Sequence, residues 1–198
     1  MAKIDDQKWE SYSYYKLNKL SRREITNKKW QKKISLYLIV ESKEKANKAI
    51  SDLKEYRQSK LLPIHEKYVA EYKQYYNEIG QRLPRLGLYS HQDLLRNRER
   101  YREEINLLER TAILRHSLNW LEPKIAKVDA QISELEQNVW KMEKKLELST
   151  VASPEEQSQV DKIIASTKLI LEENITPPEA QDVAKLEQTI FDEIMGRR

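Results

Sequence analysis

The chain has 198 residues, of which 39% are hydrophobic and 34% are charged, and it contains three glycines, six prolines and no cysteine. The modest apolar content argues against a thick globular core, scarce glycine argues against β-hairpins, and the lack of cysteine excludes disulfides and thiolate metal sites. We therefore expect an all-α chain of one domain, with or without appendages, in which long helices bury narrow apolar stripes.

The formal net charge of +4 conceals a gradient along the chain. Residues 1–60 hold 16 basic and 8 acidic residues, residues 61–150 hold 15 and 14, and residues 151–198 hold 5 and 10. A basic head and an acidic tail favour an anionic partner at one end, head-to-tail self-association, or a contact between the two ends. The longest apolar run covers only residues 36–40, so we expect no membrane span and a soluble, cytoplasmic protein.

Residues 1–40 form the first predicted segment, which is basic, rich in aromatic residues and helical. The sequence SRRE at 21–24 has the form of a capping box and predicts the start of a helix. On that helix Ile25, Trp30, Ile34 and Leu38 lie close to one side, where we expect the indole to be buried.

Basic residues cluster around this tryptophan and form a possible nucleic-acid-binding site, for DNA or RNA. The candidates are Arg22, Arg23, Lys28, Lys29, Lys32 and Lys33. Glu24 is the only acidic residue between positions 11 and 40, and clustered cations of this kind suit contacts with a phosphate backbone. An ordinary basic surface, or a contact with the acidic tail, is the alternative.

Residues 41–149 form the second predicted segment, a long helical hairpin. Its first helix covers residues 42–79, with a kink or break near residues 59–62 because Pro63 removes a backbone donor and crowds the preceding turn. The turn between the two helices falls at about residues 80–90, where two glycines and a proline gather. Ser90 and Asp93 then predict the cap of the next helix.

The second helix of the hairpin, residues 91–148, carries the strongest pattern in the sequence, a heptad seam of more than five repeats. Its apolar positions alternate by four and three: Leu107, Thr111, Leu114, Leu118, Leu121, Ile125, Val128, Ile132, Leu135, Val139, Met142 and Leu146. Pro123 falls outside the seam and leaves its phase intact, which predicts one kinked but continuous helix.

If residues 42–80 fold back along this helix, they cover it only to about residue 129, and the end of the seam needs another cover. We therefore treat that end as a possible helix-partner interface, formed by Ile132, Leu135, Val139, Met142 and Leu146. An external helix, from a second copy or another protein, is the favoured occupant. The internal alternatives are the region of Ile34 and Leu38, or the acidic tail.

Two further clusters have competing interpretations. The sequence RNRERYREE at 96–104 resembles an RNA-binding arginine cluster, but on a helix Arg96 and Arg100 can pair with nearby glutamates, so we favour a solvated helix face. The tyrosines at 68, 72, 75 and 76 resemble a base-stacking platform, but helical spacing favours a core or interface role for them.

Residues 150–198 form the third predicted segment, two short acidic helices. Ser153 and Pro154 predict one helix that runs to about Glu173, and Thr176 with the following prolines predicts another that runs through Ile194. The predicted fold is therefore an all-α, elongated antiparallel helical hairpin or coiled coil, with a basic N-terminal helical segment and short C-terminal helices.

The sequence contains none of the motifs searched for catalysis, and it points to no cofactor, metal or small-molecule substrate. Its three histidines, His65, His91 and His116, lack metal-ligand spacing. Our first hypothesis is a non-enzymatic coiled-coil interaction or assembly protein, a scaffold that organises or bridges partner proteins. The alternative is a nucleic-acid-binding accessory subunit that contacts the phosphate backbone through the basic N-terminal segment. A third reading is a helical enzyme subunit that relies on a cofactor or on a partner's active site.

Overall fold

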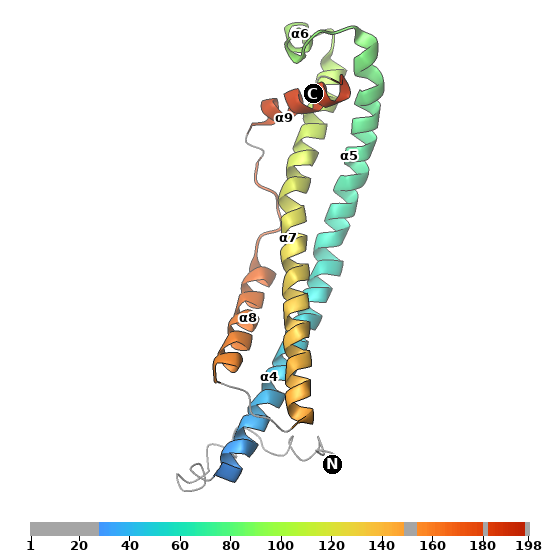
Figure 1. Ribbon diagram of the computed structural model, residues 1–198. Coiled ribbons are helices and arrows are strands. Elements are labelled where there is room, and N and C mark those ends of the chain that lie inside the picture. The colour runs from blue at the N-terminus through green and yellow to red at the C-terminus, as the bar shows by residue number, and fades with distance from the viewer. Residues whose placement is uncertain (1–27, 149–153, 180–181, 197–198) are drawn as a thin grey trace. The chain divides into compact units, whose positions relative to one another are not determined.

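The computed structural model describes residues 28–148, 154–179 and 182–196, and within these residues the regular structure is entirely helical (Figure 1). The α-helices are α4 (Lys28–Tyr56), α5 (Leu62–Arg82), α6 (His91–Arg96), α7 (Arg102–Glu147), α8 (Pro154–Glu172) and α9 (Val183–Ile194). A π-helix (Arg57–Leu61) joins α4 to α5, and a 3-10 helix (Leu83–Leu86) follows α5. The prediction of an all-α helical hairpin is confirmed.

Helix α4 continues without a break across residues 40–42, where the sequence predicted a helix boundary. Its buried stripe contains Leu36, Ile39 and Leu53, whereas Ile34 and Leu38, the expected buried positions, are only half-buried. The prediction of the buried side was therefore wrong. Apolar residues at 36–40 lie on every side of a helix, so contacts with other helices decide which of them are covered.

The distortion predicted near Pro63 is present as the π-helix Arg57–Leu61. Because the proline ring crowds the carbonyl four residues earlier, at Ser59, the backbone widens there. The extra residue also keeps the apolar residues before and after it on the same side of the helix. Tyr56 and Leu61 are five residues apart rather than four, and both are buried, at 7% and 0% exposure.

The predicted hairpin turn begins slightly later than expected, because Gly80 still lies inside α5. Gly87 has a left-handed backbone, with φ of 63°, that favours glycine. Ser90 then caps α6 as predicted, since its Oγ accepts a hydrogen bond from the Asp93 amide at 3.1 Å.

The single helix predicted for residues 91–148 is interrupted, and this part of the prediction was wrong. α6 ends at Arg96, residues 97–101 form a turn, and α7 begins at Arg102. The Asn97 carbonyl accepts hydrogen bonds from the amides of Arg100 and Tyr101, at 3.0 and 3.1 Å. The Asn97 carbonyl thus closes the turn with one three-residue and one four-residue bond.

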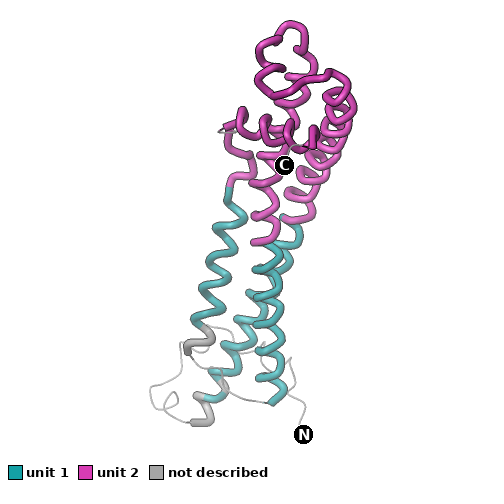
Figure 2. The backbone as a smooth tube through the Cα atoms, turned by 45° about the horizontal axis from the view of Figure 1, so that its top comes forward, with its two compact units in different colours: residues 1–56, 128–173 teal, residues 57–127, 174–198 magenta. Residues whose placement is uncertain are grey.

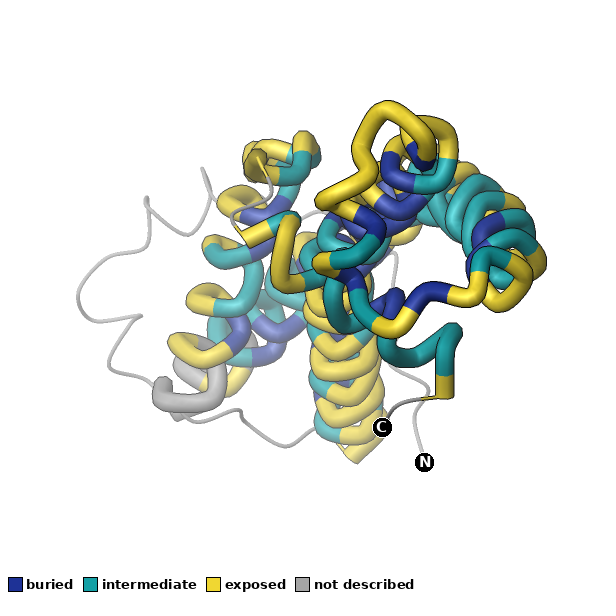
Figure 3. The backbone as a smooth tube through the Cα atoms, turned by 90° about the horizontal axis from the view of Figure 1, so that it is seen from above, coloured by how far each residue is buried: buried dark blue, intermediate teal, exposed yellow. Residues whose placement is uncertain are grey.

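The predicted heptad seam runs along the whole of α7 and faces inward. Eight of its twelve positions are buried and the other four are half-buried. Pro123 lies inside α7 and is exposed, as the position outside the seam predicted. Figure 3 shows the same alternation of buried and exposed positions along the helices.

The chain divides into two compact units, each assembled from distant stretches of sequence (Figure 2). Unit 1 combines α4, the part of α7 from Val128 onward, and α8. The pairs Lys43–Glu143 (3.2 Å) and Lys54–Glu136 (2.7 Å) show that α4 and α7 run antiparallel in this unit.

Helix α8 starts at Pro154, as predicted, and covers both neighbours in unit 1. The Gln131 side-chain nitrogen on α7 donates to the Ile163 carbonyl at 3.0 Å and to the hydroxyls of Ser166 and Thr167 at 2.8 Å each. One half-buried amide therefore fixes the position of α8 on α7.

Unit 2 combines α5, α6, the part of α7 up to Lys127, and α9. Its core gathers buried side chains from all four helices: Ile79, Leu83, Leu88, Leu94, Tyr101, Ile105, Leu108, Ala112, Ile190 and Phe191. α9 begins at Val183, not at Thr176 as predicted. Because a residue that precedes proline avoids the α conformation, the pair Pro177 and Pro178 keeps the preceding segment out of the helix.

Candidate functional site

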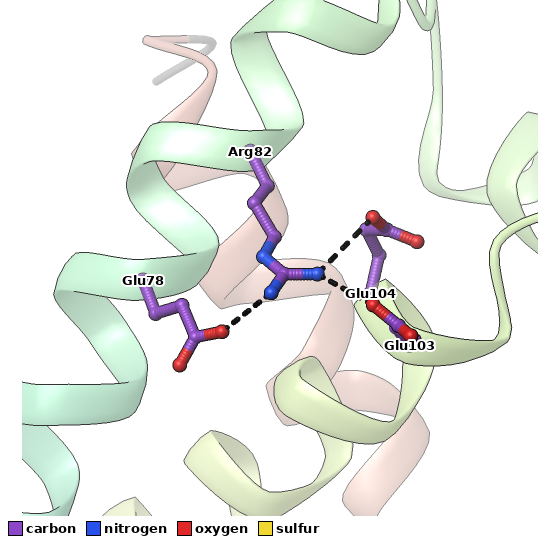
Figure 4. A network of polar contacts seen from close by, with 4 residues as sticks. All are labelled: Glu78, Arg82, Glu103 and Glu104. Carbon is purple, nitrogen blue, oxygen red and sulfur yellow. Dashed lines mark hydrogen bonds and ion pairs between the residues drawn. The ribbon is translucent and has the colours of Figure 1, made fainter.

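A groove between α5 and α7 in unit 2 is the candidate site, and an arginine network forms one end of it (Figure 4). Arg82 on α5 contacts Glu78 on its own helix at 2.7 Å and Glu103 on α7 at 2.8 Å. Its contact with Glu104 is longer, at 3.8 Å. The hydrogen bond to Glu103 raises the pKa of Arg82, so one fixed cation bridges both walls of the groove.

The groove itself is lined by polar and apolar residues of both helices: Glu78, Arg82, Glu103, Asn106, Leu107 and Arg110. Arg110 lies over the ring of Tyr75, with 5.9 Å between the guanidinium carbon and the ring centroid. One helical turn further along α7, Ile113 is 41% exposed. The groove therefore sets the half-buried Leu107 between charged edges, and Tyr75 and Ile113 are the apolar residues beside it.

The remaining tyrosines of α5 are half-buried rather than arranged for base stacking. Tyr72 and Tyr76 stack on each other, with ring centroids 5.6 Å apart. Burial raises the pKa of Tyr72, and this effect exceeds the opposing effect of Arg115. These rings pack within unit 2, in agreement with a core or interface role.

Helix α9 docks on unit 2 through apolar and charged contacts. Phe191 is fully buried, and the carboxylate of Glu193 accepts two hydrogen bonds from Arg115, at 2.9 and 3.0 Å. Two parallel bonds of this kind fix orientation as well as distance. The members of this pair are 78 residues apart, and no local sequence pattern predicts their contact.

A buried histidine lies beneath α9. His91 is 4% exposed, its ring centroid lies 5.8 Å from that of Phe191, and its Nε2 atom lies 3.7 Å from Glu187 without a hydrogen-bond partner among the described residues. Burial lowers the pKa of His91, although Gln188 and Asp192 oppose this shift.

Burial also changes the titration of Glu187, which is the carboxylate nearest to His91. Its pKa is raised, first by burial and then by Glu109, while Arg98 opposes the shift. Burial thus favours the neutral form of both groups, and their protonation affects how α9 docks.

Most of the predicted nucleic-acid-binding side chains lie outside the part of the chain that the structure describes. Arg22 and Arg23 lie outside the described residues, and of the four lysines at the start of α4 only Lys32 has a described side chain, which is exposed. Nucleic-acid binding by this segment stays a prediction.

The predicted helix-partner interface is covered within the chain. Ile132, Leu135 and Met142 are buried, at 8%, 0% and 7% exposure, while Val139 and Leu146 are half-buried. Helices α4 and α8 supply the cover, so an external helix would have to displace one of them to reach the three buried residues. The two internal alternatives, the region of Ile34 and Leu38 and the acidic tail, thus both supply cover, because α4 extends back to Lys28 and α8 packs beside it.

The arginine pairing predicted for residues 96–104 does not form. Glu103 and Glu104 contact Arg82 instead, and Arg96 lies 3.7 Å from Asp93. Residues 97–101, which were expected to belong to a solvated helix face, form a turn instead. The acids that were expected to neutralise these arginines thus belong to the groove.

Comparison with protein families, curated proteins and solved structures gives no match for this chain. Within the described residues, no three histidine or acidic side chains gather as a metal site. None of the described helices combines the length and apolar character that crossing a membrane requires.

Proposed function

We propose that the protein is a non-enzymatic helical interaction protein, which organises partner proteins by receiving a partner's helix in the α5–α7 groove. The observation that carries the proposal is the incomplete cover of Leu107 in the groove and of Tyr75 and Ile113 beside it. Leu107 and Tyr75 are half-buried and Ile113 is 41% exposed, whereas the apolar stripe of α4 in unit 1 is closed. A partner helix with a narrow apolar stripe would complete the packing at this level of unit 2.

The groove edges support a protein partner because they carry both charges. Glu78 and Glu103 are held by Arg82, and Arg110 lies beside them over Tyr75. Such polar edges around an apolar floor are typical of transient protein interfaces. Carboxylates tied to a fixed cation suit binding more than proton transfer.

The lack of cysteine allows a direct test, since a single introduced cysteine is the only thiol in the chain. Ile113→Cys, labelled with a photoactivatable maleimide crosslinker, should give one reproducible protein adduct in an extract of the native cell. Leu169→Cys on α8 is the matched control, because Leu169 is also exposed, at 71%, and lies in unit 1.

A discrete adduct at position 113 that is absent at position 169 would support the proposal. The groove proposal would be wrong if both positions gave the same adducts, or if position 113 gave none. We further propose a cytoplasmic location, with which a chain without cysteine is compatible.

A further inference from the structure

The turn between α6 and α7 presents three exposed arginines in alternating positions. They are Arg98, Arg100 and Arg102, which we call the turn arginines. Among the described residues, none of the three has a carboxylate within the 4.0 Å of an ion pair. Arg98 is near enough to Glu187 to lower its pKa, and Arg100 lies 5.3 Å from the ring centroid of Tyr101.

The turn geometry leaves these cations exposed and without a carboxylate at ion-pair distance among the described residues. On a continuous helix Arg100 would lie within reach of Glu103 and Glu104, and Arg102 within reach of Glu99, three or four residues away. The helix is broken instead at residues 97–101, and Arg82 draws Glu103 and Glu104 toward α5. Glu99 is the one acidic residue left inside the turn.

The choice of basic residue is also uneven along the chain. Between Lys73 and Lys124 there are eight arginines and no lysine. Arg82 and Arg115 bind carboxylates, Arg96 lies near Asp93, and Arg110 and Arg100 each lie over a tyrosine ring, so five of the eight have an internal contact.

The turn arginines and Arg85 are all exposed, and among the described residues none of these four has a carboxylate within 4.0 Å. A planar guanidinium binds phosphate through two hydrogen bonds and stacks on flat rings, which an ammonium group cannot do. Solubility alone would be served equally well by lysine.

We propose that the turn arginines form a binding site for single-stranded nucleic acid, distinct from the basic N-terminal segment. Phosphates contact the guanidinium groups, and the bases have an aromatic surface in the same connection between α5 and α7, where Tyr89 is 86% exposed. Single strands offer both phosphates and unstacked bases, so they fit arginine and tyrosine together better than a duplex does. The site has no base-edge readout, so binding is independent of sequence.

The test measures binding of the full chain to fluorescein-labelled single-stranded RNA of about 20 uridines, by fluorescence anisotropy at about 50 mM and about 200 mM salt. The variant changes Arg98, Arg100 and Arg102 to glutamine. Each phosphate contact to a single strand contributes about 0.7 to the salt slope, so loss of three contacts removes a slope of about 2. Wild-type affinity should therefore fall about 20-fold more than the variant's affinity between the two salt concentrations.

The matched control changes Lys48, Lys141 and Lys168 to glutamine, because these lysines are exposed and their loss lowers the net charge equally. It should retain the wild-type salt slope. A second variant replaces the turn arginines with lysine. It should keep most of the slope but bind several-fold more weakly, since lysine lacks the planar fork.

Four results would overturn the proposal. The first is no RNA binding by the wild type at about 50 mM salt, and the second is an equal loss of RNA affinity in the turn variant and the lysine control. The third is a loss of RNA affinity only when Lys28, Lys29, Lys32 and Lys33 are changed to glutamine. The fourth is binding to anionic lipid vesicles but not to RNA. Unchanged helicity by circular dichroism confirms that the variants remain folded. None of these results depends on whether the α5–α7 groove binds a protein.

Discussion

Truncation of Leu135 tests whether the heptad seam holds unit 1 together. Leu135 on α7 is fully buried, at 0% exposure. The ion pair between Lys54 and Glu136, at 2.7 Å, sets the level of α4 beside it, so Leu53, also at 0% exposure, lies in the same layer. Leu135→Ala removes three carbon atoms from a site that the antiparallel helices hold rigid.

The expected loss of stability is large. A Leu→Ala change in a closed core costs about 2–5 kcal/mol, through lost burial and the cavity left behind. For a chain of this size, each kcal/mol lowers the melting temperature by about 2–4 °C. A loss of about 3 kcal/mol therefore corresponds to a fall of about 6–12 °C.

Glu136→Ala is the matched control, one residue further along α7. It removes the ion pair with Lys54, whose side chain is 52% exposed while that of Glu136 is 50% exposed. Solvent screens such a pair, so its loss costs about 0–1 kcal/mol. Thermal unfolding followed by circular dichroism at 222 nm gives both values, and equal falls in melting temperature would refute the claim that the seam is the core.

Three further predictions concern local devices. Deletion of Ser59 removes the extra residue of the π-helix and leaves the apolar stripe in phase. Deletion of Gln74, by contrast, rotates the rest of α5 by about 100°. Thermal unfolding should show that the Gln74 deletion is less stable than the Ser59 deletion by about 2 kcal/mol or more. Gln131→Ala should cost about 1–2 kcal/mol and speed amide hydrogen exchange in α8, while unchanged exchange would show that the amide does not hold this helix. Because burial lowers the pKa of His91, the unfolded chain binds a proton below about pH 6.5 that the folded chain binds only at lower pH, so stability falls as the pH drops. The raised pKa of Glu187 has the opposite effect on stability, so urea midpoints at about pH 7.5 and 5.5 should be compared in a Glu187→Gln background. In that background a further His91→Phe change should reduce the fall in the urea midpoint between the two pH values. An unchanged fall would assign the pH dependence to other groups.

The heptad seam and the distortion at Pro63 were predictable because each follows from local rules. A spacing of four and three over twelve positions leaves a single face of the helix for burial. A proline inside a helix disturbs the carbonyl four residues earlier, and the stripe confirms the extra residue through the interval from Tyr56 to Leu61.

Sequence left the cover of the seam open between an external helix and two internal segments, because the choice depends on where α4 begins. Residues 36–40 are apolar on all sides, so their pattern does not distinguish the end of one helix from the middle of another. The contact of Arg115 with Glu193 joins residues 78 positions apart, and no local pattern relates them. Sequence periodicity reports which face of a helix is buried, but not which other segment covers it.

The break at residues 97–101 shows how one tertiary contact changes a functional interpretation. Asn97 is a weak helix former whose side-chain amide donates to the Asp93 carbonyl at 3.0 Å, so it can end α6. Sequence spacing alone assigned the following acids to the neighbouring arginines, whereas the structure assigns Glu103 to Arg82 on α5 at 2.8 Å. A carboxylate that pairs with Arg82 on α5 does not also pair with an arginine of the turn. The network that closes one end of the α5–α7 groove thereby takes the two acids nearest in spacing to Arg100, so the position of Arg82 contributes to both proposed sites.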